Sequence, residues 1–105
     1  MNSRQKGARG ERELAAYLTA EGYPSERGQQ YAGHPDAPDV RCPGLPWLHI
    51  ECKRTERLSL YDAIDQARRD CGEKLPVVFH KRNRCDWLVV MRADDFMKLA
   101  REYAA

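Results

Sequence analysis

The chain has 105 residues, and its 18 Lys and Arg against 16 Asp and Glu leave a formal net charge of +2. This length allows one domain with a single hydrophobic core, and so small a net charge does not by itself predict nucleic-acid binding. No segment has the roughly 18 consecutive apolar residues of a membrane span, and the polar N-terminus lacks the apolar stretch of a signal peptide. We therefore expect a cytoplasmic protein without membrane contacts.

The first predicted helix covers about residues 8–21, and the sequence Gly22-Tyr23-Pro24 ends it. A rotation of about 100° per residue places Glu11 in the middle of the apolar stripe and Glu13 well away from it. That stripe consists of Leu14, Ala15 and Leu18. One acid is thus expected to point towards the interior.

Residues 27–37 are rich in Gly, Gln, His and Pro and predict a loop, with a short strand before it near Ser25. Two strands follow at 39–42 and 48–53, joined by the turn-rich segment 43–46. Side chains alternate along a strand, so Leu48, Ile50 and Cys52 face one side and His49, Glu51 and Lys53 the other. Glu51 and Lys53 therefore share a face, with Cα atoms roughly 6 to 7 Å apart.

A second helix is predicted over about 60–71, with Ser59 as N-cap, Asp62 at the capping-box position and Gly72 as its end. Its expected apolar face is Leu60, Ile64, Ala67 and Cys71. Residues 77–80 and 87–91 have the composition of buried strands on either side of the basic turn 81–86. A last helix, from Asp94 or Asp95 to Tyr103, is expected to pack through Phe96, Leu99, Ala100 and Tyr103.

This order of elements predicts an α/β fold in one domain, with a central mixed sheet and helices on its faces. The four cysteines lack the short spacing of about two to four residues that a structural zinc site requires, and no export signal argues for disulfides. We expect free thiols with packing roles at Cys42, Cys52, Cys71 and Cys85.

The segment Pro38-Asp39-Val40 is followed by Ile50-Glu51-Cys52-Lys53 on the next predicted strand. Two carboxylates on adjacent strands can hold a hard cation such as Mg²⁺, with the backbone carbonyl of Ile50 or Cys52 as a further oxygen ligand. A bound cation activates water and polarises a phosphodiester, while Lys53 can orient that water or neutralise developing charge. Glu11 could complete the metal shell from the helix, directly or through water.

Each of these features also has an ordinary structural interpretation. A Glu-x-Lys pair on a strand is usually an exposed cross-strand ion pair, and a helix glutamate often extends to solvent. Here the acid and the lysine lie opposite an apolar strand face, and Glu11 points inward independently. The combination favours a nuclease site over surface ion pairs.

The residues Gly10-Glu11-Arg12-Glu13, Pro38-Asp39-Val40 and Ile50-Glu51-Cys52-Lys53, with Gln66-Ala67 on a later helix, resemble the PD-(D/E)XK nuclease superfamily. Within that superfamily, the opening from Lys6 to Leu14 is similar to archaeal-type (Hjc-like) Holliday junction resolvases, which also occur in phages. The likeness spans about residues 6–103.

The resemblance implies a restriction-endonuclease-like core and a homodimer that holds a four-way DNA junction and cuts two strands symmetrically with Mg²⁺ or Mn²⁺. It assigns metal and catalytic roles to Glu11, Asp39, Glu51 and Lys53, with Gln66 as an accessory residue that the helical count places off the apolar stripe. Relatives often carry a serine before the loop glycine, where this chain has Ala32-Gly33. This difference leaves two interpretations, in which Tyr31 or His34 serves in place of the serine or the loop serves another substrate.

Basic residues suit contacts with a DNA backbone, which give affinity without sequence information. Residues of the first helix and the catalytic strand would lie beside the metal, and those of the basic turn would reach a more distant arm. The candidates are Lys6, Arg9, Arg12, Arg54, Arg57, Lys81, Arg82 and Arg84. No helix with base-reading side chains is evident, so we expect recognition by DNA shape.

Three functional hypotheses follow. The first is a junction-resolving endonuclease that hydrolyses phosphodiester bonds during DNA recombination and repair. The second is the same chemistry on flaps, nicked DNA or duplex. The third is a DNA-binding or dimer-forming module without catalysis, in which the strand acids form surface ion pairs.

Overall fold

The computed structural model describes residues 3–28 and 38–104, which form three helices and a five-stranded mixed sheet. The helices are α1 (Ser3–Ala20), α2 (Leu60–Asp70) and α3 (Ala93–Ala104). The strands are β1 (Glu26–Arg27), β2 (Val40–Arg41), β3 (Leu48–Arg54), β4 (Leu75–Lys81) and β5 (Leu88–Val90). The chain order α-β-β-β-α-β-β-α confirms the predicted α/β fold.

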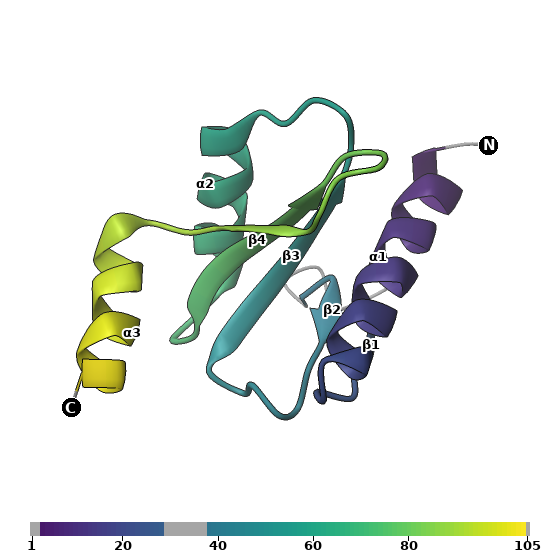
Figure 1. Ribbon diagram of the computed structural model, residues 1–105. Helices are drawn as coiled ribbons and strands as arrows, with labels where there is room; N and C mark the ends of the chain where they lie inside the picture. Colours follow the sequence, from purple (N-terminus) through teal and green to yellow (C-terminus); the bar gives the residue numbers. More distant parts are fainter. Residues whose placement is uncertain (1–2, 29–37, 105) are drawn as a thin grey trace.

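The strands lie in the sheet in their order along the chain, β1-β2-β3-β4-β5. The long central strands β3 and β4 are parallel and α2 connects them, whereas the other neighbours are antiparallel. A parallel pair needs such a crossover because the chain must return to the same end of the sheet. Figure 1 shows α1 and α2 on opposite sides of β3 and β4, with α3 beyond the far edge.

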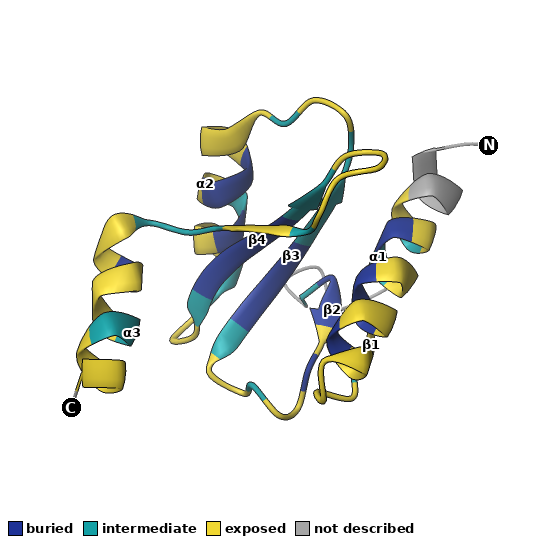
Figure 2. Cartoon of the chain, viewed as in Figure 1, coloured by how far each residue is buried: buried dark blue, intermediate teal, exposed yellow. Residues whose placement is uncertain are grey.

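Helices α1 and α2 bury separate apolar clusters against the two faces of the sheet, which appear as the dark central region of Figure 2. On the α1 face, Leu14 and Leu18 pack with Ile50 and Val77. On the α2 face, Ile64 and Ala67 pack with Val78. The apolar set predicted for β3 lies on the α1 face, which confirms the predicted alternation.

Helix α1 begins earlier than the predicted Ala8, at Ser3, and ends where the sequence predicted. Gly22 has a φ of +101°, a left-handed conformation that glycine adopts without strain, and the next amide bonds back to the Leu18 carbonyl. At Gly10 the helix approaches β3 so closely that an added Cβ would lie 2.5 Å from the Cβ of Arg54. This close approach sets the position of Glu11 above the sheet.

Helix α2 begins and ends near the predicted residues, but its cap and its buried face differ in detail. The Ser59 hydroxyl makes no capping bond to the backbone, and it donates to the Asp62 carboxylate at 2.7 Å. The buried residues are Ala63, Ile64 and Ala67, while Leu60 is 43% exposed. The prediction that Leu60 belongs to the buried face was therefore wrong, and the buried face begins one turn later, at Ala63.

The far edge of the sheet differs most from the prediction. Strand β5 was expected to be buried, yet Leu88 and Val89 are 59% and 53% exposed because no element covers this edge strand within the described residues. Helix α3 was expected to pack through four apolar residues, but Phe96 is 55% and Tyr103 is 96% exposed. Leu99 and Ala100 are half-buried, and the one buried residue among the described residues of this helix is Asp95, so half of the predicted apolar stripe faces solvent.

All four cysteines are free thiols, as predicted. Cys42 is buried and Cys52 and Cys71 are half-buried, whereas Cys85 is exposed and so lacks the packing role expected for it. Among the helices of residues 3–28 and 38–104, none is long and apolar enough to span a membrane.

Candidate active site

Asp39 lies immediately before β2 and is held against β3 by hydrogen bonds at both its backbone and its side chain. Its amide donates to the Ile50 carbonyl at 2.9 Å, and its Oδ2 accepts from the Cys52 amide at 2.7 Å. On the other side, the Gly28 amide donates to the Asp39 carbonyl at 2.8 Å. The carboxylate is therefore fixed beside the middle of β3 with 8% of the residue exposed.

Glu51 lies in the middle of β3 and is 2% exposed. Its Oε1 is 2.8 Å from Nε2 of His49, which is equally buried and two residues earlier on the same face of the strand. The side chains of Glu51 and Asp39 also hydrogen-bond each other. Two buried carboxyl groups thus meet between β2 and β3, as the sequence pattern predicted.

The two carboxyl groups differ in proton affinity because Glu51 accepts hydrogen bonds from two side chains, whereas Asp39 accepts one from the backbone amide of Cys52. Burial raises the pKa of Asp39 to about 8, and the hydrogen bond and negative charge of Glu51 add to the effect. Burial also acts to raise the pKa of Glu51, but hydrogen bonds from His49 and Asp39 outweigh it and lower the pKa. The pair therefore favours an ionised Glu51 beside a protonated Asp39 near neutral pH.

Cys52 separates Glu51 from Lys53 on the opposite face of β3. Burial, followed by the negative charges of Asp39 and Glu11, raises the pKa of the Cys52 thiol to about 12. The thiol is therefore uncharged near neutral pH, and the residue contributes to the site through its backbone amide.

Lys53 continues the same face of β3 as Glu51 and points towards α2. Its Nζ donates to Oε1 of Gln66 at 3.2 Å. The helical count correctly placed Gln66 off the apolar stripe, and the half-buried side chain meets Lys53 at the margin of that stripe. A cleft of about 200 Å³ opens over both residues and is lined further by the segment from Thr55 to Ala63.

Glu11 comes to the site from α1 with 15% of its side chain exposed, against 41% for Glu13. This difference confirms that Glu11 points inward. Its charge contributes to the raised pKa of Asp39, so the two carboxylates lie within electrostatic range. However, Glu11 Oε1 accepts a hydrogen bond from Nε of Arg27 at 2.9 Å, which neutralises it in this arrangement.

Within residues 3–28 and 38–104, no group of three or more His, Cys, Asp or Glu side chains is arranged to hold a metal ion. The structure brings Asp39, Glu51 and His49 together through hydrogen bonds, and it pairs Glu11 with Arg27. The structure thus places the four residues predicted for the metal and catalytic centre around β3. They are Asp39, Glu51, Lys53 and, at one side, Glu11.

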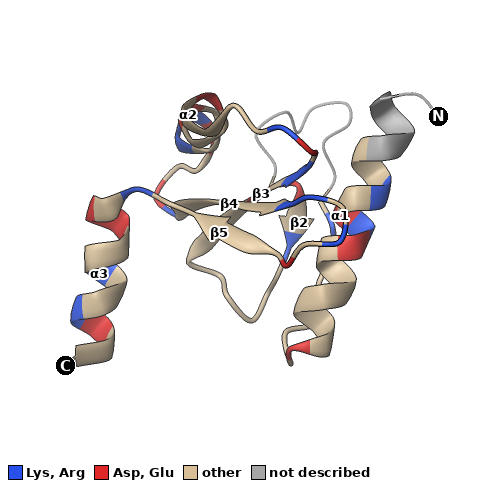
Figure 3. Ribbon diagram, turned by 45° about the horizontal axis from the view of Figure 1, so that its top comes forward, with Lys and Arg blue, Asp and Glu red and all other residues tan. Residues whose placement is uncertain are grey.

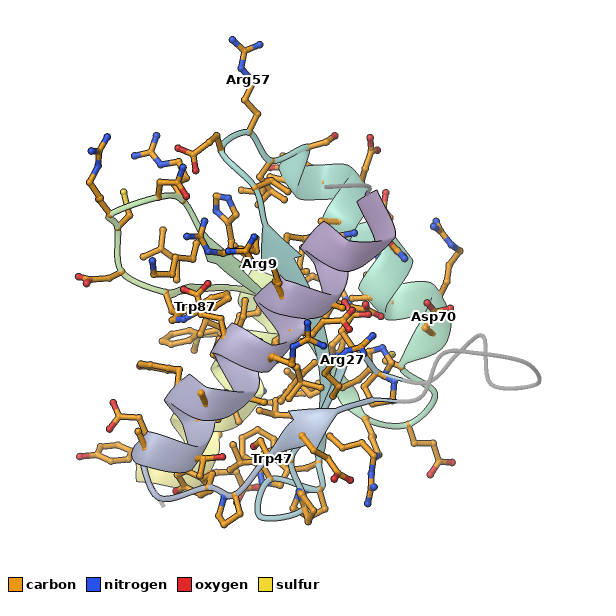
Figure 4. The ribbon with its side chains drawn as sticks, turned by 90° about the vertical axis from the view of Figure 1, so that its right-hand side faces the viewer. Arg9, Arg27, Trp47, Arg57, Asp70 and Trp87 are labelled. Atoms are coloured by element: carbon orange, nitrogen blue, oxygen red, sulfur yellow. The ribbon has the colours of Figure 1, made fainter. Side chains whose placement is uncertain are left out.

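The predicted DNA-binding residues fall into three groups, of which two lie at one end of the sheet. Arg54 and Lys81 both pair with Glu13, at 2.9 and 3.5 Å, and so tie the ends of β3 and β4 to α1. Arg57, Arg82 and Arg84 are exposed on loops at the same end of the sheet, where the ribbon in Figure 3 is coloured blue for Lys and Arg. Figure 4 shows Arg57 extending away from the body at this end, with Trp47 at the opposite end.

Helix α1 contributes the remaining basic candidates. Lys6, Arg9 and Arg12 lie on α1, and Arg9 is exposed. Arg12 lines a cavity of about 720 Å³ between α1 and β1. The loop candidates Tyr31 and His34 lie outside the described residues.

Two residues of the site were missed by the sequence reasoning. His49 could have been found, because strand alternation places it on the Glu51 face at a separation of two residues. Arg27 gave no signal, since it lies on another strand and meets Glu11 only through the antiparallel pairing of β1 with β2.

Comparison with known proteins finds no family model that matches this chain and no similar sequence among curated proteins.

Proposed function

We propose that this protein is a metal-dependent endodeoxyribonuclease of the PD-(D/E)XK type, a hydrolase whose substrate is branched DNA and specifically the four-way junction. The observation that carries the proposal is the hydrogen-bonded pair of buried carboxyl groups of Asp39 and Glu51, with Lys53 two residues further along β3. Buried acids that share a proton cost stability, and such pairs occur mainly where they serve chemistry.

The residues present fit Mg²⁺, for which Mn²⁺ can substitute. Mg²⁺ usually binds through one or two carboxylates and keeps several waters, so a pair of hard oxygen donors meets its needs. Asp39 and Glu51 would hold the ion, with the Cys52 carbonyl and Glu11 as further candidates. When bound, the ion supplies an activated water and neutralises phosphate charge.

The side chains of the protein would then divide the remaining work. Glu51 is ionised near neutral pH and ready to bind a cation, whereas Asp39 must first lose its proton. Lys53, held by Gln66 at the cleft between β3 and α2, would donate to an oxygen of the scissile phosphate. Release of Glu11 from Arg27 would leave both the acid and the guanidinium available near the phosphate.

The placement of positive charge supports the proposed substrate. Arg9 and Arg12 on α1 and the exposed arginines beyond β3 and β4 flank the acidic pair, and they would contact phosphates on two DNA segments. Such contacts position a duplex without reading bases, as expected for recognition by shape. Ion pairing with Glu13 gives Arg54 and Lys81 a structural role in addition.

A homodimer belongs to the same proposal, because symmetric cutting of a junction needs two active sites. The exposed apolar residues of α3 and β5 offer the surface for a second copy. These residues are Leu88, Val89, Phe96, Met97 and Tyr103. An apolar surface of this kind on a small protein marks an interaction site.

Two alternatives are each favoured by one observation. The same chemistry on flaps, nicked DNA or duplex is favoured by Ala32-Gly33, where junction resolvases often carry a serine before the glycine. A DNA-binding module without catalysis is favoured by the ion pair of Glu11 with Arg27. In this pair Glu11, the third candidate metal ligand, already has a positively charged partner.

The test is cleavage of matched four-way-junction, flap, nicked and linear DNA by the purified protein, with and without Mg²⁺. Glu51→Gln should abolish cutting, while Glu73→Gln, an exposed acid in the turn after α2, should not. Paired symmetric cuts in the junction alone support the resolvase. Cutting of every substrate supports the general nuclease, and no cutting with Mg²⁺ or Mn²⁺ leaves the binding module.

A further inference from the structure

The acidic pair is held in place through one oxygen of each carboxyl group. Asp39 Oδ2 accepts from the backbone amide of Cys52, a bond that any residue at position 52 except proline would supply. Glu51 Oε1 is held by the side chain of His49, so this second anchor depends on residue identity. Only one anchor of the pair can therefore be removed by a side-chain substitution outside the pair.

The imidazole of His49 has 3% of its side chain exposed, and Glu51 has 2%. An ionised carboxylate can only accept hydrogen bonds, so Nε2 of His49 carries the proton in this contact. The bond fixes the rotation of the Glu51 carboxylate while its side chain also bonds Asp39. A buried polar pair of this kind adds little net stability, because desolvation offsets the attraction.

We infer that His49 is a positioning residue that holds the Glu51 carboxylate in the orientation required for a divalent cation shared with Asp39. This role rests on the proposed function. Partners that orient a metal-binding carboxylate typically affect metal affinity or activity about 10- to 100-fold. His49 is assigned to this outer role because its Nε2 donates to Glu51 Oε1, so that this nitrogen is not available to bind the cation in this arrangement.

The competing interpretations are that His49 is a packing residue or that it is itself a metal ligand. Packing would affect stability without changing metal affinity. A nitrogen ligand would favour transition metals such as Mn²⁺ over Mg²⁺, so its removal would change the preference between the two. Metal affinity and metal preference therefore separate the three roles.

The experiment compares His49→Ala and His49→Gln with Ile64→Ala, which removes a buried apolar side chain from the same face of the sheet. Mn²⁺ binding without DNA is measured by isothermal titration calorimetry, and Mg²⁺ affinity by competition with Mn²⁺. DNA affinity in Ca²⁺ and melting temperature in EDTA are measured alongside.

We expect His49→Ala to weaken binding of both ions about 10-fold or more, with DNA affinity changed less than twofold. His49→Gln retains an N–H donor and should recover most of the loss, and Ile64→Ala should melt earlier but bind both ions normally. Equal ion affinities in His49→Ala and Ile64→Ala would overturn the inference in favour of packing. A selective loss of Mn²⁺ would overturn it in favour of a direct ligand.

Failure of the nuclease proposal gives a different result. A wild-type protein that binds Mn²⁺ but cuts no DNA would end the nuclease proposal, while the His49 variants still decide the positioning role. A wild-type protein that binds neither ion would overturn both.

Discussion

Two regions of the sheet depart from the usual distribution of polar and apolar residues in opposite directions. Beside β2 and the central strand β3, the structure buries Asp39, His49 and Glu51, which are each less than 10% exposed. Beside the edge strand β5, it exposes Val89 and Phe96, which are each more than half exposed. The first region thus holds polar groups away from water, and the second presents apolar surface to it.

Each departure lowers the stability of an isolated chain, since buried carboxyl groups lose hydration and exposed apolar surface orders water. Local rules of folding are broken mainly at functional sites. The comparison therefore separates a chemical region at β2 and β3, where a cation would replace the shared proton, from an association edge at β5 and α3, where a second copy would replace solvent.

The largest effect on cleavage is expected from Lys53→Met in the chemical region. Loss of one preorganised charge beside the reacting phosphate should lower the cleavage rate about 10²- to 10³-fold, with DNA affinity within twofold of wild type. Single-turnover cleavage and fluorescence anisotropy in Ca²⁺ measure the two quantities, with Lys74→Met, on an exposed turn, as the control. Equal losses of binding and cleavage would make Lys53 a DNA contact instead.

A matched pair of glycines in α1 tests the packing of α1 against β3, which supports the chemical region. Gly10→Ala places a Cβ against Arg54 and should cost about 1 to 3 kcal/mol in unfolding free energy. Gly7 has no atom within 4 Å of such a Cβ, so Gly7→Ala should add about 0.5 to 1 kcal/mol through helix propensity. Urea denaturation measures both, and shifts of the same sign would contradict the close approach of α1 to β3.

The proton shared by the acidic pair predicts a pH dependence of stability in EDTA. The native state raises the pKa of Asp39 from 3.8 to about 8, so it keeps a proton that the unfolded chain releases. The unfolding free energy should therefore fall as pH rises between these values. Asp39→Asn keeps an acceptor for the Cys52 amide and removes this dependence, with a relative gain of about 1 to 3 kcal/mol from pH 5 to pH 8.

Thermal melts at both pH values measure this gain, and Asp65→Asn on the exposed face of α2 is the control. If Asp39→Asn instead loses several kcal/mol at pH 8, the aspartate is a structural residue and the pair is not strained.

The smallest effect on folding is expected at the association edge. Phe96→Ser with Tyr103→Ser removes two exposed side chains, so the unfolding free energy should stay within about 0.5 kcal/mol of wild type. Analytical ultracentrifugation should nevertheless show dimers for wild type and monomers for the variant. A wild-type protein that is monomeric at all concentrations would show that β5 and α3 do not form a dimer interface.

The parts of the fold that the sequence predicted are those governed by local periodicity. The stripe of Leu14 and Leu18 and the alternation through Ile50 and Glu51 depend only on helix and strand geometry. The same rules placed Asp39 and Glu51 on neighbouring strands. They also predicted that α3 would have an apolar face, but not whether anything would cover that face.

The order of elements and the inward direction of Glu11 could be derived from the sequence, because they follow from short-range geometry. The tertiary structure was needed to show that β3 and β4 are parallel, that His49 bonds Glu51, that Arg27 neutralises Glu11 and that Gln66 reaches Lys53. It also decided that Phe96 faces solvent. Hydrogen bonds and burial of this kind depend on how separate elements are placed in space, which no pattern within one element can specify.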